Sequence, residues 1–293
     1  MNRDFLSVNS LYKSFGRTVV LSGLDLRAAR GEVIGILGRN GAGKTTLLRL
    51  ILGLLQADSG TIALDGKVPD AGGAIRRHIG YVPEKPAFHS QMTAEDVFRF
   101  RSAFYGNWDM EKALSTAKRL ELPLDKKSGV FSKGNLAKLA WCCAIAHDPQ
   151  LLLLDEPTSG LDYLIKDKIL DGLIGELVTA KKTVIIASHV MEDSFNLIDR
   201  LAVLSAGKIK EIHEAETLKA GAFLVTARLK ESAAMPDPAA ILSSEGRIVS
   251  IGVIGRENLG KVLAESCFES AEHRPMTPAE IFRALLCRTK EEL

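Results

Sequence analysis

The sequence has few cysteines and almost no excess charge. Four cysteines occur among 293 residues, and none of them forms a CxxC pair. This spacing excludes a disulfide framework and a cysteine-based zinc site, and it suits a reducing compartment. Lys and Arg number 38 against 36 Asp and Glu, so the formal net charge is only +2. Such a balance gives no electrostatic reason to bind nucleic acid, and we expect no nucleic-acid partner.

Long hydrophobic runs are absent as well. The best candidate, residues 47–55, is short and is interrupted by Arg49, whereas a membrane-spanning helix needs roughly 18 or more apolar residues. The first ten residues include Arg3 and Asp4 and lack the apolar region of a secretory signal. We therefore expect no transmembrane segment, so another polypeptide must supply the membrane part of any membrane process.

The composition that is present is typical of a soluble globular protein. Apolar residues make up 46% and charged residues 25%, values that leave enough apolar surface for a sizeable core. At roughly 150 residues per domain, the length predicts one large domain or two small ones.

Predicted strands and helices alternate along the first two thirds of the chain. Short β-like runs and turn signals over residues 5–34 predict an antiparallel β region. Further on, short apolar runs alternate with segments of helical periodicity, which is typical of a parallel α/β sheet. The predicted strands are residues 33–37, 61–64, 151–154, 183–187, 201–204 and 208–212, and the predicted helices are residues 44–55, 94–122, 134–146, 163–180 and 190–197.

The pattern changes after about residue 217. Residues 223–229 and 248–254 are β-like, and residues 257–266 and 278–287 have helical periodicity. We therefore predict a small α+β appendage over residues 217–293, without a catalytic motif.

A glycine-rich segment carries the most specific motif. Residues 38–45 read Gly-Arg-Asn-Gly-Ala-Gly-Lys-Thr, which fits Gly-x-x-x-x-Gly-Lys-Ser/Thr between a predicted strand and a predicted helix. The glycines let backbone N–H groups converge on phosphate oxygens, and the following helix N-terminus favours the same negative charge. In such a loop Lys44 reaches the β- and γ-phosphates and the Thr45 hydroxyl holds Mg²⁺.

A second motif supplies carboxylates. The apolar run of residues 151–154 leads directly into Asp155 and Glu156. One acid at a strand end holds Mg²⁺ through water, and a second one beside it acts as a general base for the attacking water. Together with the glycine-rich loop, this pair predicts hydrolysis of a nucleoside triphosphate.

Four motifs follow one another along the chain: NGAGKTT at residues 40–46, FSKGN at 131–135, LLLLDEPTSGLD at 151–162, and Ser-His at 188–189. It is their order and spacing that carry a resemblance to a known family. Over residues 1 to about 213 the chain resembles ATP-binding subunits of ABC transporters. It is more weakly similar to ATPase subunits of bacterial ABC-2-type exporters, in which the membrane protein is a separate chain and a short C-terminal extension follows the ATPase.

The resemblance implies a fold and its domains. We expect an α/β fold, namely a P-loop NTPase core of the ABC ATPase type with an antiparallel β subdomain and a helical subdomain at about residues 87–148. This ATP-binding domain would span residues 1–216, and residues 217–293 would form the small C-terminal accessory domain.

The resemblance also implies site residues. Phe15 lies where the family places an aromatic ring against adenine, although an ordinary core phenylalanine is the alternative. Asp155 would assist Mg²⁺, Glu156 would be the general base, and His189 would touch the γ-phosphate. The residues expected to hold ATP phosphates and metal are Gly38, Asn40, Gly41, Ala42, Gly43, Lys44, Thr45 and Thr46. The residues expected to complete the ATP site of the opposite subunit are Ser132, Gly134 and Asp162.

Two departures from the family pattern stand out. The usual signature Leu-Ser-Gly-Gly-Gln is replaced by FSKGN, which keeps Ser132 and Gly134 but puts Lys133 at a glycine position that must tolerate a Cβ. Glu84 stands where most members have Gln. Its carboxylate oxygen can serve Mg²⁺ as an amide oxygen does, so we interpret Glu84 as a metal and coupling residue; a solvated turn carboxylate is the alternative.

The sequence therefore predicts an ATP-binding and ATP-hydrolysing subunit that powers a separate transmembrane permease, in the direction of export. Two subunits, identical or related, would close around two Mg·ATP at the cytoplasmic face of the membrane. Aromatic residues at 98, 100, 104, 105 and 108 either dock the permease or belong to the core. The alternatives are a cytosolic ABC-type ATPase without transport and a regulatory module that does not hydrolyse ATP; intact Lys44, Asp155, Glu156 and His189 argue against the latter.

Overall fold

The fold is known from a computed structural model that describes residues 4–69, 73–180, 182–231 and 241–288. Its centre is a six-stranded sheet in the order β5-β6-β7-β3-β8-β9, parallel except for the last pair. The parallel strands have apolar sequences such as VIGIL and LLLL because layers cover both faces of the sheet. The strands are β3 (Val33–Leu37), β5 (Ile79–Val82), β6 (Leu151–Asp155), β7 (Thr183–Ser188), β8 (Arg200–Ser205) and β9 (Lys208–Glu214).

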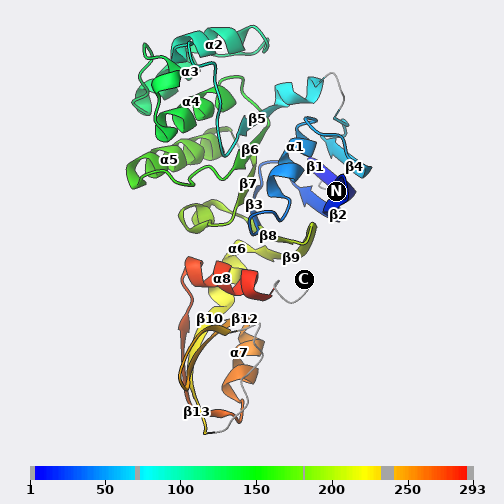
Figure 1. The fold of residues 1–293 in the computed structure, drawn as a ribbon, viewed down its shortest axis with the longest axis vertical. Coiled ribbons are helices and arrows are strands. Elements are labelled where there is room, and N and C mark those ends of the chain that lie inside the picture. Colours follow the sequence, from blue (N-terminus) through cyan, green and yellow to red (C-terminus); the bar gives the residue numbers. More distant parts are fainter. Residues whose placement is uncertain (1–3, 70–72, 181, 232–240, 289–293) are drawn as a thin grey trace.

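An antiparallel sheet lies beside this centre, as the opening of the sequence predicts. Its strands β1 (Leu6–Phe15), β2 (Thr18–Ala28) and β4 (Ser59–Leu64) pair in the order β2-β1-β4. Helix α1 (Lys44–Ile51) lies between the two sheets (Figure 1). Buried side chains of α1, β1, β2 and the central strands form one apolar cluster, which fixes the position of α1 and of the loop before it.

Helices cover the other side of the central sheet (Figure 1). The predicted helical segment 94–122 is two helices, α2 and α3, because the chain turns at Tyr105–Gly106–Asn107 between them. Trp141 of α4 is fully buried and belongs to the apolar cluster that joins these helices to the sheet. The elements are the 3₁₀ turn η1 (Ala74–His78), α2 (Ala94–Ser102), α3 (Met110–Arg119), the turn η2 (Ser128–Val130), α4 (Lys133–Ile145) and α5 (Tyr163–Ala180).

The C-terminal part is an α+β unit built on a four-stranded antiparallel sheet in the order β11-β12-β10-β13. Helices α7 and α8 contribute to different apolar clusters, and a Cβ on Gly252 of β12 would lie only 2.8 Å from Ala284 of α8. The glycine therefore lets α8 approach the sheet closely. The elements are α6 (Ala215–Gly221), β10 (Ala222–Leu229), β11 (Ile241–Glu245), β12 (Ile248–Ile254), α7 (Arg256–Leu263), β13 (Phe268–Pro275) and α8 (Pro278–Arg288).

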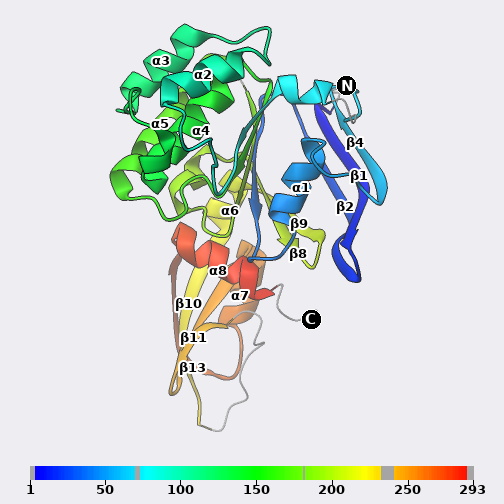
Figure 2. The ribbon, with the colours of Figure 1, turned by 45° about the horizontal axis from the view of Figure 1, so that its top comes forward.

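Helix α8 joins this unit to the central sheet (Figures 1 and 2). Phe282 of α8 meets Phe195 edge to face, with ring centroids 4.9 Å apart. Phe195 belongs to η3 (Glu192–Leu197), so the predicted helical segment 190–197 is a short 3₁₀ helix that begins two residues later than expected. The hydrogen bond from Met276 N to Ala222 O ties the start of α8 to the start of β10. In the described ranges, none of the helices combines the length and apolarity needed to cross a membrane.

Candidate active site

Four chain segments meet at the carboxyl edge of the parallel strands. The register pairs Leu37 with Ser188, Asp155 with Ala187, and Val82 with Leu154. The loops that follow β3, β5, β6 and β7 therefore leave the sheet at the same edge, which is where α/β sheets bind ligands. This arrangement brings Lys44, Glu84, Asp155, Glu156 and His189 to one place.

The loop of residues 38–46 depends on its glycines for close packing. Gly43 has φ of 108°, and a Cβ there would lie 2.7 Å from the Leu21 side chain. A Cβ on Gly38 would lie 2.7 Å from the carbonyl oxygen of Leu204. The loop packs so closely before α1 that neither position has room for a larger residue. The amino end of α1, which begins at Lys44, then faces the space in the loop.

Lys44 is the buried cation of the site. Its side chain is only 6% exposed, and Nζ donates to the carbonyl oxygens of Gly38 at 2.8 Å and Arg39 at 3.2 Å. The same Nζ lies 3.3 Å from Glu156 Oε1. The ammonium is therefore held between the loop and the Glu156 carboxylate, and it lies where phosphates in such a loop would be bound.

Asp155 and Thr45 form a set of hard oxygen donors. The Thr45 hydroxyl donates to Asp155 Oδ2 at 2.8 Å, and the Tyr81 hydroxyl donates to the same oxygen at 3.4 Å. Burial raises the pKa of Asp155, and the charges of Glu156 and Glu84 raise it further against the opposing hydrogen bond of Thr45. A divalent cation at these oxygens would favour the ionised carboxylate, so the donor set fits Mg²⁺.

Glu156 is held by several donors. Ser188 Oγ donates to Oε2 at 2.6 Å, and the His189 backbone N–H donates to Oε1 at 3.0 Å. His189 Nδ1 lies 2.9 Å from the same Oε1. Burial opposes ionisation, but the hydrogen bonds from Ser188 and His189 and the charge of Lys44 outweigh it, so the pKa of Glu156 is lowered. Glu156 therefore remains an ionised acceptor in a buried position.

Glu156 also has a φ of 49°, a left-handed value that is uncommon outside glycine. Its backbone N–H donates to Ala187 O at 2.8 Å, so the turn after β6 is fixed by β7. The unusual backbone turns the carboxylate back toward Lys44 and His189, and such a conformation is typical of functional sites.

The signature and the loop around Asp162 lie on α4 and α5. Ser132 caps α4 by accepting from the Asn135 N–H at 3.2 Å, and Asp162 caps the start of α5 by accepting from the Ile165 N–H at 3.0 Å. A Cβ on Gly134 would lie 2.3 Å from Ile165, so this glycine permits the close contact of the two helices. Ser132 and Asp162 are both exposed and therefore free to meet another molecule.

Lys133 and Phe15 are also exposed. Lys133 is the first residue of α4, so its Cβ is tolerated, and its ammonium lies against Gly160. Phe15 is 49% exposed at the end of β1, with Lys13 Nζ 5.4 Å from its ring centroid. It is therefore not an ordinary core phenylalanine, and its ring is available for stacking.

The sequence motifs assign no role to two residues of the site. Tyr81 and Ser188 are the polar positions through which β5 and β7 hold the carboxylates of Asp155 and Glu156. A polar side chain near the carboxyl end of an otherwise buried strand is the signal that would have identified them.

The aromatic segment of residues 98–108, at the end of α2 and after it, divides into core and surface. Phe98 is fully buried and Trp108 packs against the core, whereas Phe100 and Phe104 are 54% and 60% exposed. The rings of Phe100 and Phe104 meet edge to face with centroids 5.1 Å apart. This exposed pair, and not the whole segment, is the part available to a partner.

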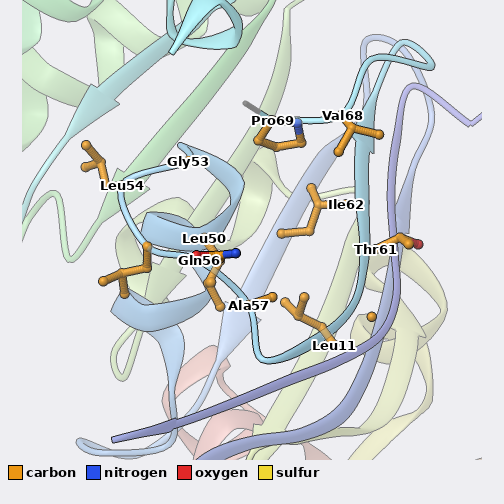
Figure 3. Close-up of a pocket in the computed structure, with 12 residues that line it drawn as sticks. Leu11, Leu50, Gly53, Leu54, Gln56, Ala57, Thr61, Ile62, Val68 and Pro69 are labelled. Atoms are coloured by element: carbon orange, nitrogen blue, oxygen red, sulfur yellow. The ribbon is translucent and has the colours of Figure 1, made fainter. Parts of the chain in front are cut away.

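A groove of about 560 Å³ lies at the other end of α1 (Figure 3). Leu54 and Ala57, after α1, line it together with Leu11 and Ile62 of the antiparallel sheet. Lys44 is at the opposite, amino end of α1. The groove is therefore separate from the phosphate loop.

Comparison with known proteins agrees with this geometry. The sequence profile of the ABC transporter family matches residues 21–159. The chain is 31% identical to the ABC transporter ATP-binding protein YtrB of Bacillus subtilis, over 73% of each protein. It is 36% identical to the Nod factor export ATP-binding protein I of Sinorhizobium fredii, over 69% of this chain and 61% of that protein.

The fold of the chain is also similar to that of a subunit whose structure was solved as a dimer. The ATP-binding cassette MJ0796, in a dimeric post-hydrolysis state bound to ADP and Pi, superposes with a TM-score of 0.65 at 26% identity. The match covers 72% of this chain and 98% of that one.

Proposed function

Because this chain is an ATP-binding subunit of the ABC transporter family, with the ATPase activity of that family, we propose that it powers a separate membrane permease by closing as a dimer around ATP. Each ATP site would combine the phosphate loop and Glu156 of one subunit with Ser132 of the other. Closure reshapes the permease, and hydrolysis removes the γ-phosphate that both subunits contact, so the dimer reopens.

One observation carries the proposal. Lys44, Glu156 and His189 are assembled within hydrogen-bonding distance at the sheet edge, whereas Ser132 and Asp162 cap their own helices and expose their polar side chains. The first group would carry out hydrolysis. The second group would bind ATP that is held by the other subunit. A second subunit satisfies both requirements at once.

The residues have separate tasks. Lys44 binds the β- and γ-phosphates, and ionised Glu156 orients the attacking water and accepts its proton. Ser188 holds one oxygen of Glu156 and His189 binds the other. This fixed position beside Glu156 supports the proposed contact of His189 with the γ-phosphate.

Thr45, Asp155 and Glu84 would hold Mg²⁺. In the part of the chain that the structure describes, no three acidic, His or Cys side chains form a metal cage. That fits Mg²⁺ at a nucleotide, which takes one or two protein oxygens, water and phosphate oxygens. The bound ion would neutralise charge on the β- and γ-phosphates.

Export is the proposed direction, and the cytoplasmic face of the membrane is the proposed location. The support for export is the similarity to the Nod factor export ATP-binding protein I. The exposed pair of Phe100 on α2 and Phe104, two residues after the end of α2, is the proposed contact with the permease.

The test isolates the tagged chain from solubilised membranes of its own cells. We expect a polytopic membrane protein to co-purify in fixed ratio and to be lost from the double variant Phe100→Glu, Phe104→Glu. Val19→Glu is the matched control, because Val19 is 61% exposed in the antiparallel sheet. A chain that hydrolyses ATP but binds no membrane protein would instead be an ABC-type ATPase without transport.

A further inference from the structure

Three large apolar side chains stand out on the described surface. Tyr163, Val130 and Leu164 are 76%, 74% and 70% exposed, the highest values among the described large apolar residues. Val130 lies two residues before Ser132, and Tyr163 and Leu164 directly follow Asp162. Exposed apolar side chains gathered at one functional surface indicate contact with another protein.

A cavity of about 320 Å³ lies between α8 and the ATP site. Its lining includes Arg39 of the phosphate loop and His189 with Val190 after β7, opposite Phe282 and Leu286 of α8. The cavity therefore has one wall from the catalytic edge and one wall from the C-terminal unit. Figure 2 shows α8 at this junction.

The cavity walls are firmly placed. Phe282 packs edge to face on Phe195, and Ile281 and Leu285 of α8 are buried in the same cluster as Phe195. Because large buried side chains of both parts interlock, α8 keeps its position beside His189.

We propose that a second copy of this chain inserts Tyr163 and Leu164 into this cavity, so that α8 is part of the dimer interface. The proposal rests on the dimer closure proposed above. The same insertion occurs twice across a two-fold axis, because each copy carries both the Tyr163–Leu164 pair and the cavity.

The chemistry of the two surfaces matches. The apolar part of the cavity, from Val190, Phe282 and Leu286, receives the apolar pair. Arg39 and Arg283 outnumber the one carboxylate, Glu192, that lines the cavity, and the exposed Asp162 carboxylate precedes the inserted pair. Arg39 and His189 line the cavity. The same two residues border the ATP site that Ser132 and Asp162 of the other copy would complete.

The inference has a functional consequence. Insertion would make closure depend on the C-terminal unit, since α8 forms half of the receiving cavity. The appendage would then support ATP-driven pairing directly, without contact with the permease.

A native cysteine allows a direct test, because Cys287 of α8 lines the cavity. Leu164→Cys is made together with Glu156→Gln, which slows hydrolysis, and Cys267→Ser, which removes the other partly exposed thiol. Cys142 and Cys143 are buried, and burial raises the pKa of the Cys143 thiol to about 12, so both stay unreactive. A short thiol cross-linker should give a covalent dimer with Mg·ATP and at least about tenfold less without it.

Two controls separate this contact from others. Cys287→Ser should abolish the covalent dimer. Val68→Cys in place of Leu164→Cys should give no covalent dimer, because Val68 is an exposed apolar residue at the groove of Figure 3, away from the cavity. Leu164→Asp in the Glu156→Gln chain should weaken the ATP-dependent dimer at least about tenfold while the monomer binds ATP unchanged.

Light scattering in parallel distinguishes the possible failures. An ATP-dependent dimer that forms without the 164–287 cross-link and resists Leu164→Asp overturns this inference alone. A chain that binds Mg·ATP and never pairs overturns the inference together with the proposed closure of two identical subunits.

Discussion

Asp155 and Glu156 are adjacent in the sequence, yet their surroundings shift their pKa values in opposite directions. Burial and two neighbouring carboxylates raise the pKa of Asp155, whereas hydrogen bonds and the charge of Lys44 lower that of Glu156 despite its burial. The ionised form of Asp155 would be stabilised by an added cation such as Mg²⁺, whereas the ionised form of Glu156 is already stabilised by the ammonium of Lys44. At the scale of single residues, this difference supports the proposed metal-holding role of Asp155 and the proposed general-base role of Glu156.

Lys44→Ala tests the phosphate-binding role. Without the ammonium that lies between the loop carbonyls and Glu156, ATP turnover should fall at least about 100-fold. Steady-state phosphate release measures this, with Lys126→Ala, an exposed lysine outside the site, as the control. Unchanged turnover in Lys44→Ala would overturn the assignment of the loop.

Glu84→Gln tests whether the carboxylate at this position is required. An amide oxygen keeps a lone pair for the metal, so the affinity for Mg·ATP should change less than about tenfold. Calorimetric titration of the Glu156→Gln chain, with and without Glu84→Gln, measures it. Loss of binding would show that the Glu84 charge itself is an obligatory ligand.

His147 should make stability depend on pH. It is 1% exposed, its Nε2 lies 3.2 Å from Ile79 O, and burial lowers its pKa from 6.5 to about 4. Between these values the unfolded chain binds more protons, so stability falls as the pH drops from 6.5 toward 4, by up to about 3 kcal/mol.

Urea unfolding at pH 7 and pH 5 measures this contribution. His147→Gln, whose amide can still donate to Ile79 O, should lose less stability between the two pH values than the parent chain. Equal losses in both proteins would contradict the assignment of the pH dependence to His147.

At the scale of elements, strands that are buried on both faces could be predicted from the sequence, and an exposed edge strand could not. Strands β3, β6 and β7 are covered on both faces, so their apolar runs are unmistakable. Strand β13 lies at a sheet edge and exposes most of its residues, which leaves no alternating pattern, and it was not predicted. The sequence predicts helices over residues 94–122 but does not place the turn at Gly106 that separates α2 from α3, because helical periodicity is present on both sides of it.

The same limit applies to the site. Lys44, Thr45, Asp155 and Glu156 belong to local motifs, so the sequence reveals them. Ser188 was noted only as the neighbour of His189, because its bond to Glu156 spans 32 positions and exists only through the pairing of β6 with β7.

Helix α8 should owe part of its stability to its first turn. Thr277 and Glu280 form a reciprocal cap, with Thr277 N–H donating to Glu280 Oε2 at 2.8 Å and Glu280 N–H donating to Thr277 Oγ1 at 3.4 Å. Thr277→Ala should therefore cost about 1 kcal/mol and lower the thermal midpoint by about 2 °C.

Differential scanning calorimetry compares this variant with Ser270→Ala, a change at an exposed strand position. The control should stay within about 0.5 kcal/mol of the parent. Equal, negligible effects of the two changes would contradict a stabilising cap on α8.

At the scale of the whole molecule, one chain carries both complementary halves of the proposed ATP site. The phosphate loop and Glu156 lie at the sheet edge, and Ser132 and Asp162 lie exposed on the helical side. The C-terminal unit adds α8 beside His189 and thereby connects the appendage to the catalytic edge. Such an arrangement is completed by pairing, and the pairing should depend on ATP.

The most direct measurement of this claim is the solution mass of Glu156→Gln by light scattering, with and without Mg·ATP. The variant should remain a 31.8 kDa monomer without nucleotide and double its mass with Mg·ATP, because slow hydrolysis traps the closed state. The same variant with Lys44→Ala should stay monomeric under both conditions. A Glu156→Gln chain that binds Mg·ATP but keeps the monomer mass would contradict closure of two identical subunits around ATP.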